Sequence, residues 1–122
     1  MAKSHDVHKA RLVLEEAIRA MFDARREVFA PWGECTSEAR YYRDLEVRSF
    51  TELREAAEEL RRLAWRLPGR RKKGLWPVFW RLERAWAHSH AALDGWIWAR
   101  SVLKNGDAAL ERVRGAVNTL FQ

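Results

Sequence analysis

The residues with the clearest chemical potential form a basic stretch that is followed at once by aromatic residues, GRRKKGLWPVFWR at positions 69–81. Arginine and lysine attract phosphate groups, and indole rings can stack on nucleic-acid bases. The pattern therefore indicates a surface that could hold the backbone and bases of a nucleic acid. The candidate binding residues are Arg66, Arg70, Arg71, Lys72, Lys73, Trp76, Trp80, Arg81 and Arg84.

The positive charge of the chain is concentrated around this stretch. Positions 66–104 hold nine arginines and lysines and two acidic residues, whereas the net charge of the whole chain is +6. Elsewhere acidic and basic residues alternate, as on an ordinary solvated surface. Because like charges repel one another, the cluster favours a binding role. A solvated turn and a segment at a lipid interface are the simpler alternatives.

The aromatic residues of the stretch have two possible positions. The spacing of Trp76, Phe79 and Trp80 is also typical of residues that pack into a helical core. Phe79 shares a face with Leu82, whereas Trp76 and Trp80 lie one turn apart on another face. The two tryptophans are therefore the candidates for the surface, as stacking residues or as a contact with a partner protein.

Arg84 and His90 lie six residues apart in the segment RAWAHSH. This pair resembles the arginine and histidine of small helical HEPN-type ribonucleases, in which the histidine acts in acid–base cleavage of RNA and the arginine stabilises phosphate charge. The resemblance covers these two residues and the fold class, and Ala85 stands where that family usually has a polar residue. The alternative is a structural His90, hydrogen-bonded beside Ser89 in a layer that faces the core.

Other reactive side chains form no recognisable site. His5 and His8 are one turn apart and His88 and His90 are close in sequence, but no cysteine or Glu-x-x-His set completes a metal site. Cys35 is the single cysteine, and its acidic neighbours disfavour the thiolate form. The basic stretch lacks the Gly-Lys-Ser/Thr ending of a phosphate-binding loop. We therefore predict no catalytic residue, no metal and no cofactor.

The composition is that of a single helical domain over residues 1–122, with 48% hydrophobic residues and no internal disulfide. The N-terminus lacks the apolar segment of a signal peptide, and no run of about 18 apolar residues could span a membrane. We expect a cytoplasmic protein. Scarce amide residues and abundant arginine are also typical of thermophile proteins.

The elements that would position these residues are predicted to be α-helices, because apolar residues recur at helical spacing between breaks in the chain. We expect helices over about 5–29, 37–67, 77–104 and 107–120. Within the second, Ser49 and Glu52 form a possible capping box, although no glycine or proline separates them from residues 37–48. Pro77 and Asn105-Gly106 are the start and stop signals of the third, and Asp107 caps the fourth.

The predicted fold is all-α, a mainly antiparallel four-helix bundle with a long tryptophan-rich third helix. The first helix carries a heptad in which large apolar residues alternate with alanines, so that another helix can approach closely. The heptad positions are Val7, Ala10, Leu14, Ala17, Met21, Ala24 and Val28. If the chain's own helices leave this seam open, we expect a homodimer through it.

The function favoured by these features is a non-enzymatic nucleic-acid-binding bundle, a small subunit of a nucleoprotein complex. The small basic helical subunits of CRISPR effector complexes are similar in size and character, although no motif is shared. The sequence does not distinguish DNA from RNA. Two alternatives remain: a protein-interaction or adaptor module that uses the tryptophan-rich and alanine-heptad helices, and the HEPN-like ribonuclease.

Overall fold

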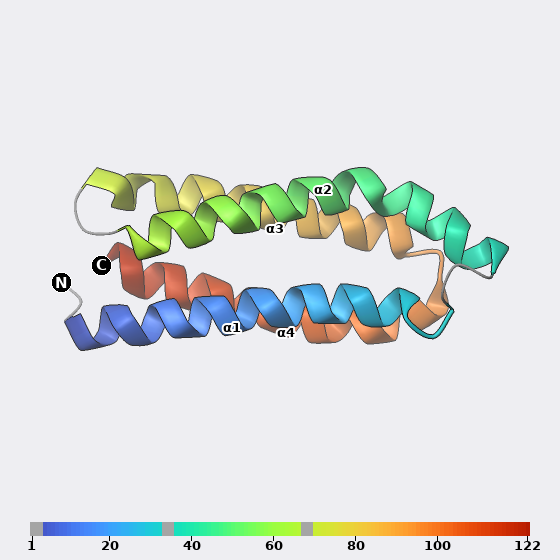
Figure 1. Cartoon of the computed structure of the whole chain (residues 1–122), viewed down its shortest axis with the longest axis horizontal. Helices are drawn as coiled ribbons and strands as arrows, with labels where there is room; N and C mark the ends of the chain where they lie inside the picture. The colour runs from blue at the N-terminus through green and yellow to red at the C-terminus, as the bar shows by residue number, and fades with distance from the viewer. Residues whose placement is uncertain (1–3, 33–35, 67–69) are drawn as a thin grey trace.

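The structure, a computed structural model, describes residues 4–32, 36–66 and 70–122, and of residues 70 and 71 only the backbone. Its elements are α1 (Ser4–Phe29), α2 (Ser37–Trp65), the short 3-10 helix η1 (Arg70–Gly74), α3 (Leu75–Leu93) and α4 (Ile97–Phe121). Figure 1 shows the four long helices side by side, with successive helices running in opposite directions. The described residues contain no β-strand, so the all-α antiparallel bundle is confirmed.

The bundle consists of two closely packed helix pairs, α1 with α4 and α2 with α3. The heptad alanines of α1, Ala10, Ala17 and Ala24, are at most 6% exposed, and Ala109 and Ala116 of α4 are buried too. Small residues on both helices allow their backbones to approach closely. The chain's own α4 therefore covers the heptad seam, and a homodimer would have to form through another surface.

The predicted end of the third helix is wrong, because the chain turns at residues 94–96 rather than at Asn105-Gly106. Trp96, the residue before α4, is only 5% exposed, and its ring stacks on Tyr42 at a centroid distance of 5.1 Å. An aromatic cluster at this end of the bundle thus fixes the turn. As a result α4 has 25 residues, close to the 26 residues of α1 against which it packs.

Gly106 and Asp107, predicted to end one helix and cap the next, instead lie inside α4. Gly106 faces the Trp86 ring of α3, which leaves no room for a side chain. Asp107 Oδ1 accepts a hydrogen bond from Trp86 Nε1 at 2.8 Å, and its Oδ2 lies 3.2 Å from His90 Nε2. Both residues therefore serve the contact between α3 and α4 rather than a turn.

The start of α2 at Ser37 is confirmed, because the Thr36 side chain caps the helix by accepting a hydrogen bond from a backbone N–H at 3.2 Å. The capping box of Ser49 and Glu52 is wrong, since Ser49 is buried in the interior of α2. Its hydroxyl donates to the backbone carbonyl of Glu46 at 2.9 Å. The helix passes through this position without interruption.

The predicted apolar stripes of the second and fourth helices form much of the core. Their buried residues include Leu53, Ala57, Leu60, Ala64, Leu110, Val113, Val117 and Leu120. Leu45, earlier on α2, is 50% exposed and does not belong to this core. In the parts of the chain that the structure describes, no helix has a stretch long and apolar enough to cross a membrane.

Candidate nucleic-acid interface

The basic stretch lies at one end of the bundle, where α2 ends, α3 begins and the N- and C-terminal turns of α1 and α4 lie nearby (Figure 1). Arg66 follows α2, Lys72 and Lys73 lie in η1, and Trp76 lies in the first turn of α3. Since η1 contacts α2, α3 and α4, it is held against the bundle. Residues 70–74 therefore form a short helix packed on the bundle rather than an extended loop.

Three of the predicted cations at this end have no acidic partner among the described residues. Arg66 and Lys73 are exposed and Lys72 is half-buried, and no carboxylate of the described residues lies within 4 Å of their charged groups. Uncompensated cations at a surface raise the local concentration of anions. The side chains of Arg70 and Arg71 lie outside the described residues, so their role stays a prediction.

Arg81 and Arg84 lie further along α3, on the side that faces α2. Arg81 Nη1 is 2.8 Å from Glu59 Oε2, so its charge is already compensated within the chain. Arg84 is exposed, and among the described residues no carboxylate lies within 4 Å of its guanidinium. Arg84 is therefore available to an anion, whereas Arg81 would first have to leave Glu59.

Phe79 and Trp80 lie in the core and at the surface as expected, whereas Trp76, a candidate for the surface, packs partly against the core. Phe79 is fully buried, Trp80 is 54% exposed, and Trp76 is half-buried between them. The Trp76 ring lies 6.3 Å from that of Trp80 and 6.5 Å from that of Phe121, which is itself 45% exposed. We call Trp76, Trp80 and Phe121 the aromatic patch. It gives the basic end of the bundle an open ring surface beside η1.

Comparison with known proteins assigns the chain to no family. No family model, no curated protein and no solved structure matches the chain. The resemblance to HEPN-type ribonucleases requires Arg84 and His90 to act on the same phosphate group, so it depends on where the two side chains lie.

Arg84 and His90 lie on different sides of α3. Arg84 lines a shallow hollow between α2 and α3 together with Glu52 and His88. His90 lines a separate hollow between α3 and α4, where it is hydrogen-bonded to Asp107. Within one chain, nothing brings the two side chains to the same phosphate group. The hydrogen bond of His90 instead fits the structural role weighed against catalysis.

The histidine that lies beside Arg84 is His88, and the sequence analysis did not pair these two residues. The two residues are four positions apart, which places them one turn apart on the same face of a helix. His88 Nδ1 lies 3.8 Å from Glu52 Oε2 of α2. The helical spacing alone could have paired His88 with Arg84, whereas the partner on α2 depends on how the helices align. No group of three or more potential metal ligands occurs among the described residues.

Proposed function

We propose that the chain binds single-stranded nucleic acid at the end of the bundle formed by η1 and the first turns of α3. The observation that carries this proposal is the exposure of Trp80, which is 54% open to solvent in a segment whose cations Lys72, Lys73 and Arg84 lie within 4 Å of no described carboxylate. The residues that bind phosphate would be Arg66, Arg70, Arg71, Lys72, Lys73 and Arg84. Arg81 would join them when it leaves Glu59. Trp76 and Trp80 would stack on bases.

A single strand suits this surface better than a duplex. The bases of a duplex are stacked on one another, whereas those of a single strand can lie on an aromatic ring, at about 1–3 kcal/mol per base. The cations beside the ring gain affinity by releasing counterions from the phosphates. Because the surface covers only one end of the bundle, we further propose that the chain acts as a small subunit of a larger nucleoprotein complex.

Replacing Arg70, Arg71, Lys72 and Lys73 with alanine should weaken binding to all sequences alike, because phosphate contacts do not read bases. The slope of log affinity against log salt should flatten by roughly three units, since each phosphate contact on a single strand contributes about 0.7. Titration of labelled oligo-dT and oligo-rU at several salt concentrations measures the slope and compares DNA with RNA.

A matched variant removes four charges from the half of the bundle away from η1, at the exposed residues Arg26, Arg40, Arg48 and Arg100. It should keep most of the affinity and of the salt slope. Equal losses in the two variants would show that binding follows net charge alone. Unchanged binding of the first variant to both oligonucleotides would show that η1 is only a solvated turn.

The second arm of this experiment uses Trp80→Ala. Loss of one stacking surface should lower the affinity for single strands about fivefold to 150-fold, with the salt slope nearly unchanged. Because more than half of Trp80 is exposed, the variant should unfold at the same urea concentration as the parent. A large loss of stability would instead identify Trp80 as a packing residue and remove the basis of the proposal.

A protein-interaction module remains the second candidate, and the other end of the bundle favours it. Ile97 is 79% exposed there, and Trp32 and Trp98 are 37% and 39% exposed. Apolar side chains that gather at a surface often mark an interface. Self-association through this end would appear as a mass that rises with concentration in sedimentation experiments. A constant monomer mass would leave this end available only to a different protein.

A further inference from the structure

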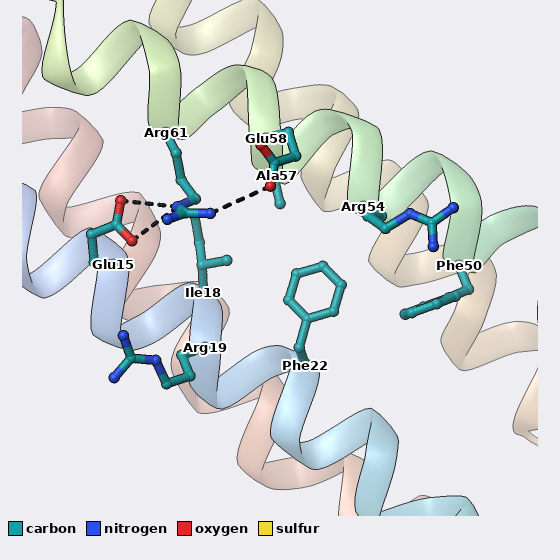
Figure 2. A pocket seen from close by; sticks show the side chains of 9 residues that line it. All are labelled: Glu15, Ile18, Arg19, Phe22, Phe50, Arg54, Ala57, Glu58 and Arg61. Atoms are coloured by element: carbon teal, nitrogen blue, oxygen red, sulfur yellow. Dashed lines mark hydrogen bonds and ion pairs between the residues drawn. The ribbon is translucent and has the colours of Figure 1, made fainter.

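A hollow between α1 and α2 is lined by side chains from both helices (Figure 2). Its volume of about 320 Å³ falls at the lower end of the range for small-molecule sites. It depends on none of the residues proposed to bind nucleic acid. The shape of the hollow, the residues of its floor and the charges around it determine which kind of ligand it could hold.

The hollow exists because α1 and α2 are joined by long charged side chains rather than by small apolar ones. On one side of it, Arg61 Nε lies 2.9 Å from both carboxylate oxygens of Glu15. Beyond its other side, Arg25 and Glu46 form a second pair with an Nη2–Oε1 distance of 2.7 Å. Pairs of this length keep the two helices further apart than alanines keep α1 and α4, so the segment between the pairs stays open.

The floor of the hollow is apolar. It is formed by the buried residues Ile18 and Ala57 and by the half-buried rings of Phe22 and Phe50. The two rings meet edge to face with their centroids 5.9 Å apart, and Figure 2 shows them extending toward each other from α1 and α2. Partly exposed rings in a concave surface favour an apolar group over water.

On one side of the rim the charged groups are paired with one another. Besides its contacts with Arg61, Glu15 accepts a hydrogen bond from Trp65 Nε1 at 3.0 Å, and Arg61 Nη1 also donates to Glu58 at 3.4 Å. Burial raises the pKa of Glu15, but the hydrogen bonds from Arg61 and Trp65 outweigh burial and hold the pKa below its ordinary value. Glu15 therefore stays ionised and paired, and it is not available to a ligand.

The rest of the rim carries positive charge without a close ion pair to any carboxylate of the described residues. No such carboxylate lies within 4 Å of the guanidinium of Arg19 or Arg54, although Arg19 is near enough to Glu15 to help lower the pKa of that carboxyl. The Arg54 guanidinium lies 5.7 Å from the centroid of the Phe50 ring, so a cation stands directly beside the apolar floor. This combination suits a ligand with an apolar body and one negative charge.

We propose that the hollow between α1 and α2 binds a small amphipathic anion, an aromatic or short aliphatic carboxylate. Its apolar body would lie against Phe22 and Phe50, and its carboxylate would accept hydrogen bonds from Arg54, with Arg19 adding to the positive potential. A purely polar anion would leave the apolar floor uncovered, and a neutral apolar molecule would leave the cations unused. This proposal stands independently of the nucleic-acid proposal.

Binding of 2-naphthoate to the ¹⁵N-labelled chain, followed by amide chemical shifts, tests the proposal. We expect saturable shifts confined to residues near 15–22 and 50–61. The uncharged 2-naphthalenemethanol, which has the same ring system, should bind at least about fivefold more weakly because it lacks the charge-assisted contact. Absence of saturation up to the solubility limit of naphthoate, or shifts centred elsewhere, would overturn the proposal.

Two substitutions on α2 distinguish binding of naphthoate in the hollow from its attraction to the net positive charge of the chain. Arg54→Gln should weaken naphthoate binding about fivefold and leave binding of the alcohol unchanged. Arg48→Gln removes the same charge from a side chain that is 93% exposed and lies outside the hollow, so it should change neither. Equal effects of the two substitutions would show that naphthoate is attracted by net charge and would reject the site.

Discussion

Replacing Arg25 with alanine is expected to lower the free energy of unfolding by about 3–5 kcal/mol, because it leaves a buried carboxylate without its partner. Glu46 is fully buried, and Arg25 Nε and Nη2 donate to its carboxylate at distances between 2.7 and 3.2 Å. The guanidinium also lies 3.7 Å from the centroid of the Phe50 ring. Urea denaturation of the parent and the variant measures the loss.

The double variant Arg25→Met with Glu46→Leu is the matched control. It should lose much less stability than Arg25→Ala, because the desolvation cost of both charges disappears together with their attraction. Apolar side chains of similar length would then occupy the same space between α1 and α2. If the double variant is as unstable as Arg25→Ala, the ion pair itself stabilises the fold and our expectation is wrong.

The pH dependence of stability provides a separate check on Glu46. Burial raises the pKa of Glu46, and the hydrogen bonds and charge of Arg25 offset this only in part. The pKa of such a carboxyl group is higher in the folded chain than in the unfolded chain. The group then contributes most to the stability of the fold at a pH below its unfolded pKa, and this contribution is lost as the pH rises through the folded pKa. Relative to the parent, Glu46→Gln should therefore become more favourable as the pH rises. Glu15, whose pKa is lowered, should show the opposite trend in Glu15→Gln.

The sequence predicted the inward faces of the helices but not this ion pair. Helical spacing shows which residues of one helix face the same way, and it identified the alanine seam of α1 correctly. Arg25 and Glu46 lie on different helices, and the chain has 23 basic and 17 acidic residues that could pair in many ways. Which basic and acidic side chains pair depends on how α1 and α2 are aligned along their length. For the same reason, the sequence did not predict the pair of Arg81 on α3 and Glu59 on α2.

The turn between α3 and α4 was misplaced for a related reason. Asn105-Gly106 is a good local stop signal, but the stop that the chain uses depends on contacts with a distant segment. Gly95 packs so closely on Tyr42 that a Cβ would come within 2.9 Å of its hydroxyl, and Trp96 stacks on the same ring. By contrast, the exposure of Trp80 followed from its helical phase alone, so this part of the candidate interface could be predicted.

Gly106→Ala is expected to destabilise the fold by about 2–3 kcal/mol, although the same change in an ordinary helix interior stabilises by about 1 kcal/mol. The added Cβ would overlap the ring of Trp86. That ring is 3% exposed, and its Nε1 is held by Asp107 at 2.8 Å. Because the ring cannot rotate away in a close-packed interior, α4 would have to move away from α3. Chemical denaturation measures the change.

Gly115→Ala is the matched control on the same helix. Apart from the backbone of its own helix and its two chain neighbours, a Cβ at Gly115 would meet no atom within 4 Å, so this substitution should stabilise the fold by about 0.5–1 kcal/mol. The two glycine-to-alanine variants should therefore shift the denaturation midpoint in opposite directions. Trp86→Phe should restore part of the stability of Gly106→Ala, because the smaller ring leaves space for the methyl group. If Gly106→Ala stabilises the chain as Gly115→Ala does, Trp86 does not fix the distance between α3 and α4.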